Sequence, residues 1–168
     1  RFQRVVARQA LSELSAVGVT AEGVAEPAHR LRATKQELDD ALTIFGSEIV
    51  EQRRDGSVML DRHRLFSLGH HMRARLLGEV LRRLAGMDHA PRRAQLLAAL
   101  EGLERGKGVA TLAHHRLEAR SNQIEITREL TALPELIPLS AGMVWDARWR
   151  IEGGPQGDVG PLPESVLD

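Results

Sequence analysis

The spacing of apolar residues changes once along this chain, and that change most constrains its fold. Up to Gly106 apolar residues recur every three or four positions, which is the period of an amphipathic helix. Beyond Gly108, short segments alternate apolar and polar residues between turn-forming residues, which is typical of strands. We therefore predict an α+β protein, mainly α, with a helical body followed by a small C-terminal sheet-bearing module.

The first half of the helical body is predicted to hold two helices. The apolar stripe of residues 2–17 predicts the first, which Gly18 should end. Thr20 is a candidate N-cap for the second, a long amphipathic helix that should stop at Gly46. Pro27 should kink or restart this helix, because its ring removes a backbone donor and crowds the preceding turn.

One β-hairpin is predicted within the helical body. Asp55-Gly56 lies between the apolar pair Ile49-Val50 and the apolar run 58–60. An Asp-Gly pair between two apolar runs favours a hairpin turn.

Two more helices should follow this hairpin. Asp61 is a candidate N-cap for one continuous helix with a broad leucine stripe, which ends before Gly86. Pro91 should occupy the first turn of the last helix, which runs to Gly106.

The part after Gly108 is predicted to form short strands. Three of them lie within residues 109–114, 115–120 and 122–129. The proline-containing segment 131–140 is expected to be loop or edge, and residues 143–154 should add one more strand. In that strand Trp145 and Trp149 would share the core face, while Asp146 and Arg148 would share the other face as a contact pair.

These patterns predict three regions. We expect a helical domain over residues 1–87, a small α+β module over residues 88–152 and an irregular tail over residues 153–168. The sequence starts without methionine inside a helical pattern, so we expect a piece of a longer protein.

The neutral net charge hides a basic middle segment. Residues 53–105 carry eleven basic and six acidic side chains, a net charge of +5, and 21 of the 23 basic residues in the whole chain are arginine. Arginine suits phosphate, so this segment is a weak indication of contact with nucleic acid.

Composition also bounds the compartment. The chain has no cysteine, which excludes disulfides and thiolate metal sites, and we expect a cytoplasmic protein. No stretch approaches the roughly 18 apolar residues of a membrane span, so no membrane partner is expected.

Two pairs of arginines are candidate RNA-binding residues. Arg4 and Arg8 share one helix face and can follow a phosphate backbone; the alternative is a solvated face or ion pairs with a neighbouring domain. Arg92 and Arg93 lie where a helix begins, and positive charge there is unfavourable unless it serves an anion. The alternative for this pair is an Arg–Glu network on the surface.

The adjacent histidines are not expected to form a site. In a strand, His114 and His115 point to opposite faces and cannot hold one ion together, so we expect one buried and one exposed. His70 and His71 likewise lack a recurring ligand spacing. We predict no catalytic residue and no metal site in this chain.

Several stretches in order resemble tRNA(Ile)-lysidine synthases of the alphaproteobacterial kind. They are RFQRVVAR at residue 1, GVTAEGVAEPAHRLRATKQELDDAL at residue 18, VLRRLAGMDHAPRRAQLLAAL at residue 80, and TLAHHRLE followed by WDARWRIE at residue 145. The third resembles a Tyr-Pro-Pro-Arg motif, with His89 and Ala90 in place of Tyr-Pro. The fourth resembles Thr-Leu-Gly-Gly-Cys-Arg, with Ala113, His114 and His115 in place of Gly-Gly-Cys.

The resemblance implies a C-terminal portion without catalysis of its own. The family's Ser-Gly-Gly-x-Asp-Ser loop, which binds ATP, is absent from these 168 residues. The whole enzyme would use ATP with Mg²⁺, held by an N-terminal PP-loop domain, to attach lysine to the wobble cytidine of tRNA(Ile) with a CAU anticodon. This chain would hold the tRNA, with Arg4 and Arg8 matching the family's spaced arginines.

The predicted partners are therefore that tRNA and the N-terminal PP-loop domain of the same protein, and a homodimer is left open. The alternative to tRNA binding is an accessory helical domain that mediates protein contacts or stabilises its parent enzyme. Neutral net charge and only five aromatic residues favour this alternative.

Overall fold

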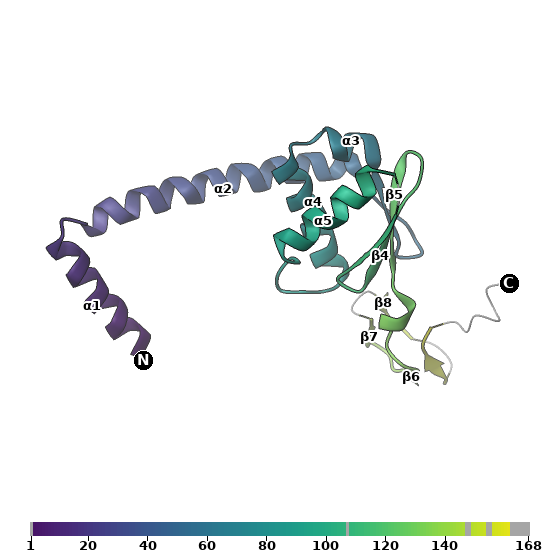
Figure 1. The fold of residues 1–168 in the computed structure, drawn as a ribbon. Coiled ribbons are helices and arrows are strands. Elements are labelled where there is room, and N and C mark those ends of the chain that lie inside the picture. Colours follow the sequence, from purple (N-terminus) through teal and green to yellow (C-terminus); the bar gives the residue numbers. More distant parts are fainter. Residues whose placement is uncertain (1, 107, 147–148, 154–155, 162–168) are drawn as a thin grey trace. The chain divides into compact units, whose positions relative to one another are not determined.

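The computed structural model describes residues 2–106, 108–146, 149–153 and 156–161 (Figure 1). Its internal contacts divide the chain into two compact units, Arg1–Ile44 and Phe45–Asp168. The fold is α+β with more helix than strand, as predicted. The predicted domain boundary at residue 87 lies inside the second unit.

The first unit consists of α1 (Phe2–Ala16) and most of α2 (Ala21–Ile49). Gly18 ends α1 with φ of 85°, and the Thr20 hydroxyl accepts a hydrogen bond of 3.0 Å from the amide of Gly23. Both predicted helix ends are thus confirmed. The predicted restart at Pro27 and stop at Gly46 are wrong, because α2 continues through both, and a proline near a helix start removes only one hydrogen bond.

The apolar side chains of the first unit are exposed as far as residue 38. Every residue from 4 to 38 is exposed, including Val6, Val17 and Leu31 at 65%, 75% and 71%. Ion pairs one turn apart on the surface of α2 join Lys35 to Asp39, at 3.0 Å, and Arg30 to Glu26, at 3.3 Å. Such pairs and the Thr20 cap support a helix only modestly, and residues 4–38 contribute no buried apolar side chain.

The second unit is built on a five-stranded antiparallel sheet. In spatial order its strands are β1 (Val50–Gln52), β2 (Val58–Asp61), β5 (Gln123–Arg128), β4 (His115–Ala119) and β3 (Val109–Leu112). The predicted hairpin β1–β2 is confirmed, but it does not belong to a separate helical body. β2 pairs with β5 in a register that sets Leu60 opposite Ile124, and both side chains are fully buried. Three consecutive buried residues in β2 require neighbours on both edges and both faces.

Three helices supply the rest of this core. They are α3 (Arg62–Ser67), α4 (His70–Leu84) and α5 (Arg93–Glu104). The α5 helix packs against α4, β3 and β4, and Leu77, Leu81 and Leu103 are fully buried. The continuous helix predicted after Asp61 is wrong, since Leu68 and Gly69 are extended and separate α3 from α4. The predicted cap is confirmed, because Asp61 accepts from the amide of Arg64 at 2.9 Å.

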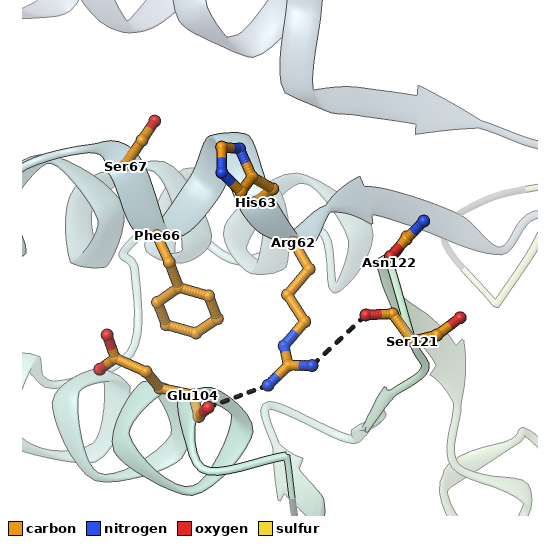
Figure 2. A pocket seen from close by; sticks show the side chains of 7 residues that line it. All are labelled: Arg62, His63, Phe66, Ser67, Glu104, Ser121 and Asn122. Carbon is orange, nitrogen blue, oxygen red and sulfur yellow. Dashed lines mark hydrogen bonds between the residues drawn. The ribbon is translucent and has the colours of Figure 1, made fainter.

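Arg62 ties three of these elements together (Figure 2). Its guanidinium donates to the carbonyl of Glu104 at the end of α5, at 2.9 Å, and to that of Ser121 in the β4–β5 turn, at 3.4 Å. Its backbone amide donates to the carbonyl of Asn122 at 2.9 Å. The arginine is therefore held in one orientation by backbone acceptors.

The adjacent histidines do not share a strand. Ala113 and His114 have φ of 52° and 60° and form the tight turn between β3 and β4, where both central residues adopt positive φ. His114 is exposed at this turn, whereas His115 begins β4, is 1% exposed and has its Nδ1 2.7 Å from the carbonyl of Ala113. The strand prediction is wrong for His114, and the prediction of one buried and one exposed histidine is confirmed.

The last described segments form two small ladders after a 3₁₀ turn, η1 (Leu130–Ala132). The predicted single strand over 143–154 is instead a hairpin of β7 (Val144–Trp145) and β8 (Trp149–Arg150), because Asp146 turns the chain with φ of 50°. β6 (Ile137–Pro138) pairs with β9 (Asp158–Val159), so the predicted tail is not wholly irregular. Arg148, the predicted partner of Asp146, lies outside the described residues.

Asp146 pairs with Arg128 of β5 at 2.9 Å. The side chains of Asp146 and Arg128 are 2% and 16% exposed. This buried ion pair fixes the β7–β8 hairpin to the end of the sheet.

Candidate nucleic-acid interface

Arg92 and Arg93 lie at the start of α5. Arg92 is the N-cap residue and Arg93 the first helical residue, so Pro91 stands just before the cap rather than in the first turn as predicted. Neither a side-chain cap nor an acidic residue occupies this helix start. The amide of Gln95 donates to the carbonyl of Arg92 at 2.9 Å, but the amides before it have no acceptor inside the helix. The start of α5 therefore combines amide donors with two exposed arginines.

The start of α4 adds to this positive region. Arg93 Nη2 contacts Nδ1 of His71, in the first turn of α4, and the rings of His70 and His71 pack edge to face at 4.7 Å. The first turn of α4 also carries no acidic residue, and its N-cap, Gly69, has no side chain to accept from it. Two helix starts therefore meet without a compensating carboxylate, which favours an anion at this place.

Arg92 and Arg93 are not part of an Arg–Glu network among the described residues. In the described part of the chain, no carboxylate lies within ion-pair distance of Arg92 or Arg93. Arg4 and Arg8, one turn apart on α1 in the first unit, are also exposed and also lack a described carboxylate partner. All four residues keep the unpaired charge that a phosphate contact requires.

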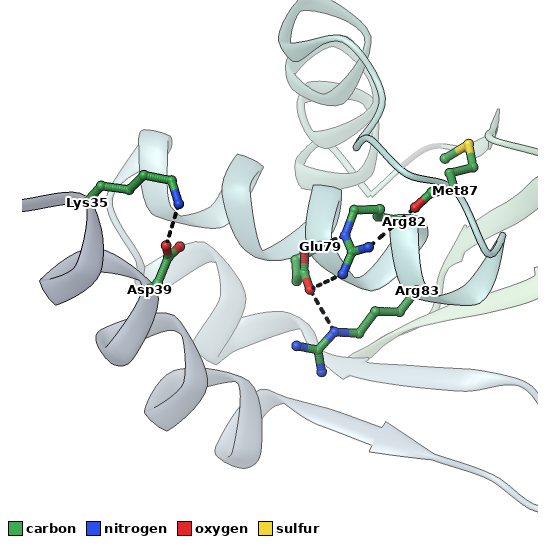
Figure 3. Close-up of polar contacts among 6 residues, drawn as sticks. All are labelled: Lys35, Asp39, Glu79, Arg82, Arg83 and Met87. Atoms are coloured by element: carbon green, nitrogen blue, oxygen red, sulfur yellow. Dashed lines mark hydrogen bonds and ion pairs between the residues drawn. The ribbon is translucent and has the colours of Figure 1, made fainter. Parts of the chain in front are cut away.

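Arg82 and Arg83, at the end of α4, provide the contrast (Figure 3). Arg82 donates to both oxygens of Glu79 at 2.9 Å, and Arg83 Nε donates to Glu79 Oε1 at 2.7 Å. The hydrogen bonds from Arg82 lower the pKa of Glu79 to about 2, against the partial desolvation that raises it. Lys35 is likewise paired with Asp39 on α2 (Figure 3). These cations already have a carboxylate partner.

Other candidates do not form a reactive centre in the described residues. No group of three histidine or acidic side chains there could hold a metal ion. Trp145 is 9% exposed and belongs to the core, so it offers no free ring face. No helix in the described part is long and apolar enough to cross a membrane.

The sequence patterns did not indicate a second cationic site in the second unit. Arg62 and Phe66 of α3 line a cavity whose other walls come from residues around 104 and 121. No local pattern could reveal it, because the hydrogen-bond partners of Arg62 are 42 and 59 residues away along the chain.

The chain is similar in sequence to a tRNA(Ile)-lysidine synthase. It is 28% identical to that enzyme of Ruegeria pomeroyi over 153 residues, a match that covers 91% of this chain and 36% of the relative. The chain thus spans about a third of the relative's length, and the resemblance predicted from the sequence motifs is confirmed. No family model and no solved structure matches the chain.

Proposed function

We propose that this chain is the non-catalytic, tRNA-holding portion of an enzyme of the tRNA(Ile)-lysidine synthase type. The observation that carries the proposal is the start of α5, where Arg92 and Arg93 are exposed, with no carboxylate partner among the described residues, in a helix start that no side chain caps. Arginine and first-turn amides are the groups that bind phosphate oxygens and so fix the register of a nucleic acid. The similarity to a named tRNA-modifying enzyme over 91% of the chain supports tRNA as that nucleic acid.

The chemistry would belong to the rest of the parent protein. An N-terminal PP-loop domain would bind ATP with Mg²⁺, activate the wobble cytidine of tRNA(Ile) with a CAU anticodon, and exchange AMP for lysine. The contribution of this chain would be positional: phosphate contacts would hold the tRNA while the target base enters a site on that domain. We expect the 168 residues alone to be inactive, in a protein that works in the cytoplasm.

A salt-dependent titration tests the proposal. The whole chain is titrated with tRNA(Ile) bearing CAU and with an unrelated tRNA at two salt concentrations. We expect the logarithm of the affinity to fall with the logarithm of salt by about 0.7 to 0.9 per phosphate contact, and Arg92→Gln or Arg4→Gln to make this slope shallower.

Arg83→Gln is the matched control, because it removes one positive charge that Glu79 already balances. Equal losses in Arg92→Gln and Arg83→Gln would point to overall charge rather than to a site. Absence of binding to either tRNA at low salt would contradict the proposal for this chain.

One observation favours the second candidate, a domain that mediates protein contacts. In the first unit Val6 and Leu14 of α1 are 65% and 41% exposed. The relative is nearly three times as long as the matched segment, and the proposed occupant of this face is the N-terminal PP-loop domain. Sedimentation of this chain mixed with that domain tests the idea. Leu14→Gln should weaken the association without changing tRNA affinity, whereas sedimentation of the chain alone as a dimer would indicate a second copy on this face.

A further inference from the structure

The second unit contains a cavity of about 460 Å³ that is largely open to solvent, between α3, the end of α5 and the β4–β5 turn (Figure 2). Its lining residues come from α3, the end of α5 and the β4–β5 turn: Arg62, His63, Phe66, Ser67, Glu104, Ser121 and Asn122. A cavity of this size is in the range that holds a small organic ligand, and its charge and lining indicate the class of ligand.

The cavity carries an unbalanced positive charge. The guanidinium of Arg62 is bonded to two backbone carbonyls, and no carboxylate among the described residues pairs with it. The carboxylate of Glu104 does not balance it either, because that group is paired with Arg73 of α4 at 3.1 Å. Carbonyl acceptors orient a guanidinium without neutralising it, so Arg62 presents a fixed cation to a phosphate.

An aromatic ring lies beside this cation. Phe66 is half-buried in the cavity wall, and Figure 2 shows its ring extending from α3 toward the end of α5, to one side of Arg62. The guanidinium carbon of Arg73 lies over one face of the ring, 5.2 Å from its centroid, so a base would stack on the other face. The chain has only three phenylalanines and two tryptophans, so a ring at the wall of a cationic cavity is a rare feature here. Flat rings of this kind stack on nucleobases.

Polar groups complete the lining. Ser121 and Asn122 are exposed at the β4–β5 turn on the opposite wall from Phe66 (Figure 2). In this view the Ser121 hydroxyl and the Asn122 side-chain nitrogen point away from Arg62 and Phe66, and the Ser121 carbonyl is the group that faces Arg62. His63, also in the lining, adds ring nitrogens at the rim.

We infer that this cavity binds one nucleotide, with its phosphate on the guanidinium of Arg62 and its base against Phe66. The inference rests on the proposed function in one respect, namely that the nucleotide is an unpaired residue of the bound tRNA. A free mononucleotide would satisfy the same groups, so the experiment must separate these two sources.

Amide chemical shifts of the whole isotope-labelled chain provide the readout. The probes are cytidine 5′-monophosphate, cytidine, inorganic phosphate and a single-stranded cytidine hexanucleotide. We expect the monophosphate and the hexanucleotide to shift the amides of Glu104, Ser121 and Asn122, with cytidine and phosphate each at least tenfold weaker. Tighter binding of the hexanucleotide than of the monophosphate would assign the site to RNA, and the reverse order would assign it to a free nucleotide.

Two variants test the assigned groups. Phe66→Leu keeps an apolar side chain but removes the flat ring, and should weaken the hexanucleotide about tenfold, the usual loss for one stacked base. Arg62→Lys keeps the charge but loses the planar fork, and should weaken the monophosphate by a similar factor. Arg54→Gln, an exposed arginine in the β1–β2 turn, is the control that should leave both affinities unchanged. Thermal melts establish that each variant is folded.

The inference and the proposed function can fail separately. Salt-sensitive tRNA binding that is unchanged in folded Phe66→Leu and Arg62→Lys would overturn the cavity site and leave the proposed function intact. Shifts by the monophosphate without any tRNA binding would retain a nucleotide site and overturn the proposed function. Absence of shifts at these three amides with every probe would overturn the inference.

Discussion

Leu81 and Ile126 in the second unit are fully buried, whereas Leu31 and Val17 in the first unit keep more than two thirds of their surface exposed. All four are apolar residues at regular spacing, so the sequence pattern is equally clear in both units. The difference lies in what covers them. In the second unit a sheet and three helices enclose the leucine stripes, while α1 and α2 as far as residue 38 present theirs to solvent.

Amphipathic spacing therefore predicts that a helix forms, but it does not predict how stable the helix is. Most helical stability comes from burial of the apolar face, at about 25 cal/mol per Å². The second unit gains this energy from its own residues. Residues 4–38 of the first unit bury no apolar side chain, which is why we propose a protein contact there.

The largest expected effect separates the two units directly. Leu81→Ala removes a fully buried side chain and should lower the free energy of unfolding by about 3 kcal/mol. Leu31→Ala, with the same chemical change at a residue 71% exposed, should cost less than about 0.5 kcal/mol. Urea unfolding is followed by circular dichroism, which reports on the helices of both units, and by tryptophan fluorescence, which reports on the second unit, since that unit holds both tryptophans. A comparable loss in both variants would mean that Leu31 is buried in solution.

The second effect concerns the buried ion pair of the second unit. Asp146→Asn tolerates the positive φ of this position but leaves Arg128 without its charge partner, so we expect a loss of about 2 to 3 kcal/mol. Lys35→Gln breaks an exposed pair in the first unit and should cost less than about 0.5 kcal/mol. Equal effects in denaturant unfolding would show that burial does not distinguish these pairs.

The third effect depends on pH. Arg82 and Arg83 lower the pKa of Glu79 from its ordinary 4.5 to about 2, so the ionised carboxylate stabilises the fold above pH 4.5 and loses this contribution as pH falls toward 2. Because the three side chains are partly exposed, Glu79→Gln should cost only about 1 kcal/mol at pH 7. Thermal melts should show the wild type and the variant converging as pH is lowered to about 2. A constant difference would assign the effect to packing.

The smallest effect on global unfolding is expected at the cap of α2. Thr20→Ala removes the acceptor of the Gly23 amide and should cost about 1 kcal/mol of local helix stability. Faster hydrogen exchange at the first amides of α2 should reveal this loss, while the fluorescence transition of the second unit stays unchanged. A shift of that transition would indicate that the first unit folds together with the second.

Features that depend on neighbouring residues were predictable from the sequence. Gly18 and Thr20 act within one helical turn, Asp61 caps through the amide three residues on, and Asp55-Gly56 closes a hairpin between adjacent strands. Helix ends, caps and tight turns depend on the backbone within a few residues. The type of the residue at that position is therefore enough to predict them.

Features that depend on distant residues were not predictable. The sequence of residues 58–61 does not indicate that β2 pairs with residues 123–128. The cavity beside Arg62 forms only when these strands have paired. The turn at His114 was not predictable for a different reason. A non-glycine residue rarely adopts positive φ, and histidine does not indicate a turn. The exposed charge of Arg92 and Arg93 was foreseen from helix position, whereas the contact of Arg93 with His71 required the packed structure.

The pairing of β2 with β5 also governs how this protein is made. During synthesis the buried residues of β2 leave the ribosome more than 60 positions ahead of the strand that covers their edge. Until then Val58, Met59 and Leu60 form a short apolar edge, which is a template for association with other chains. Completion of the core therefore waits for a distant pairing with a high cost in loop closure, and a product truncated between the two strands would be prone to aggregate.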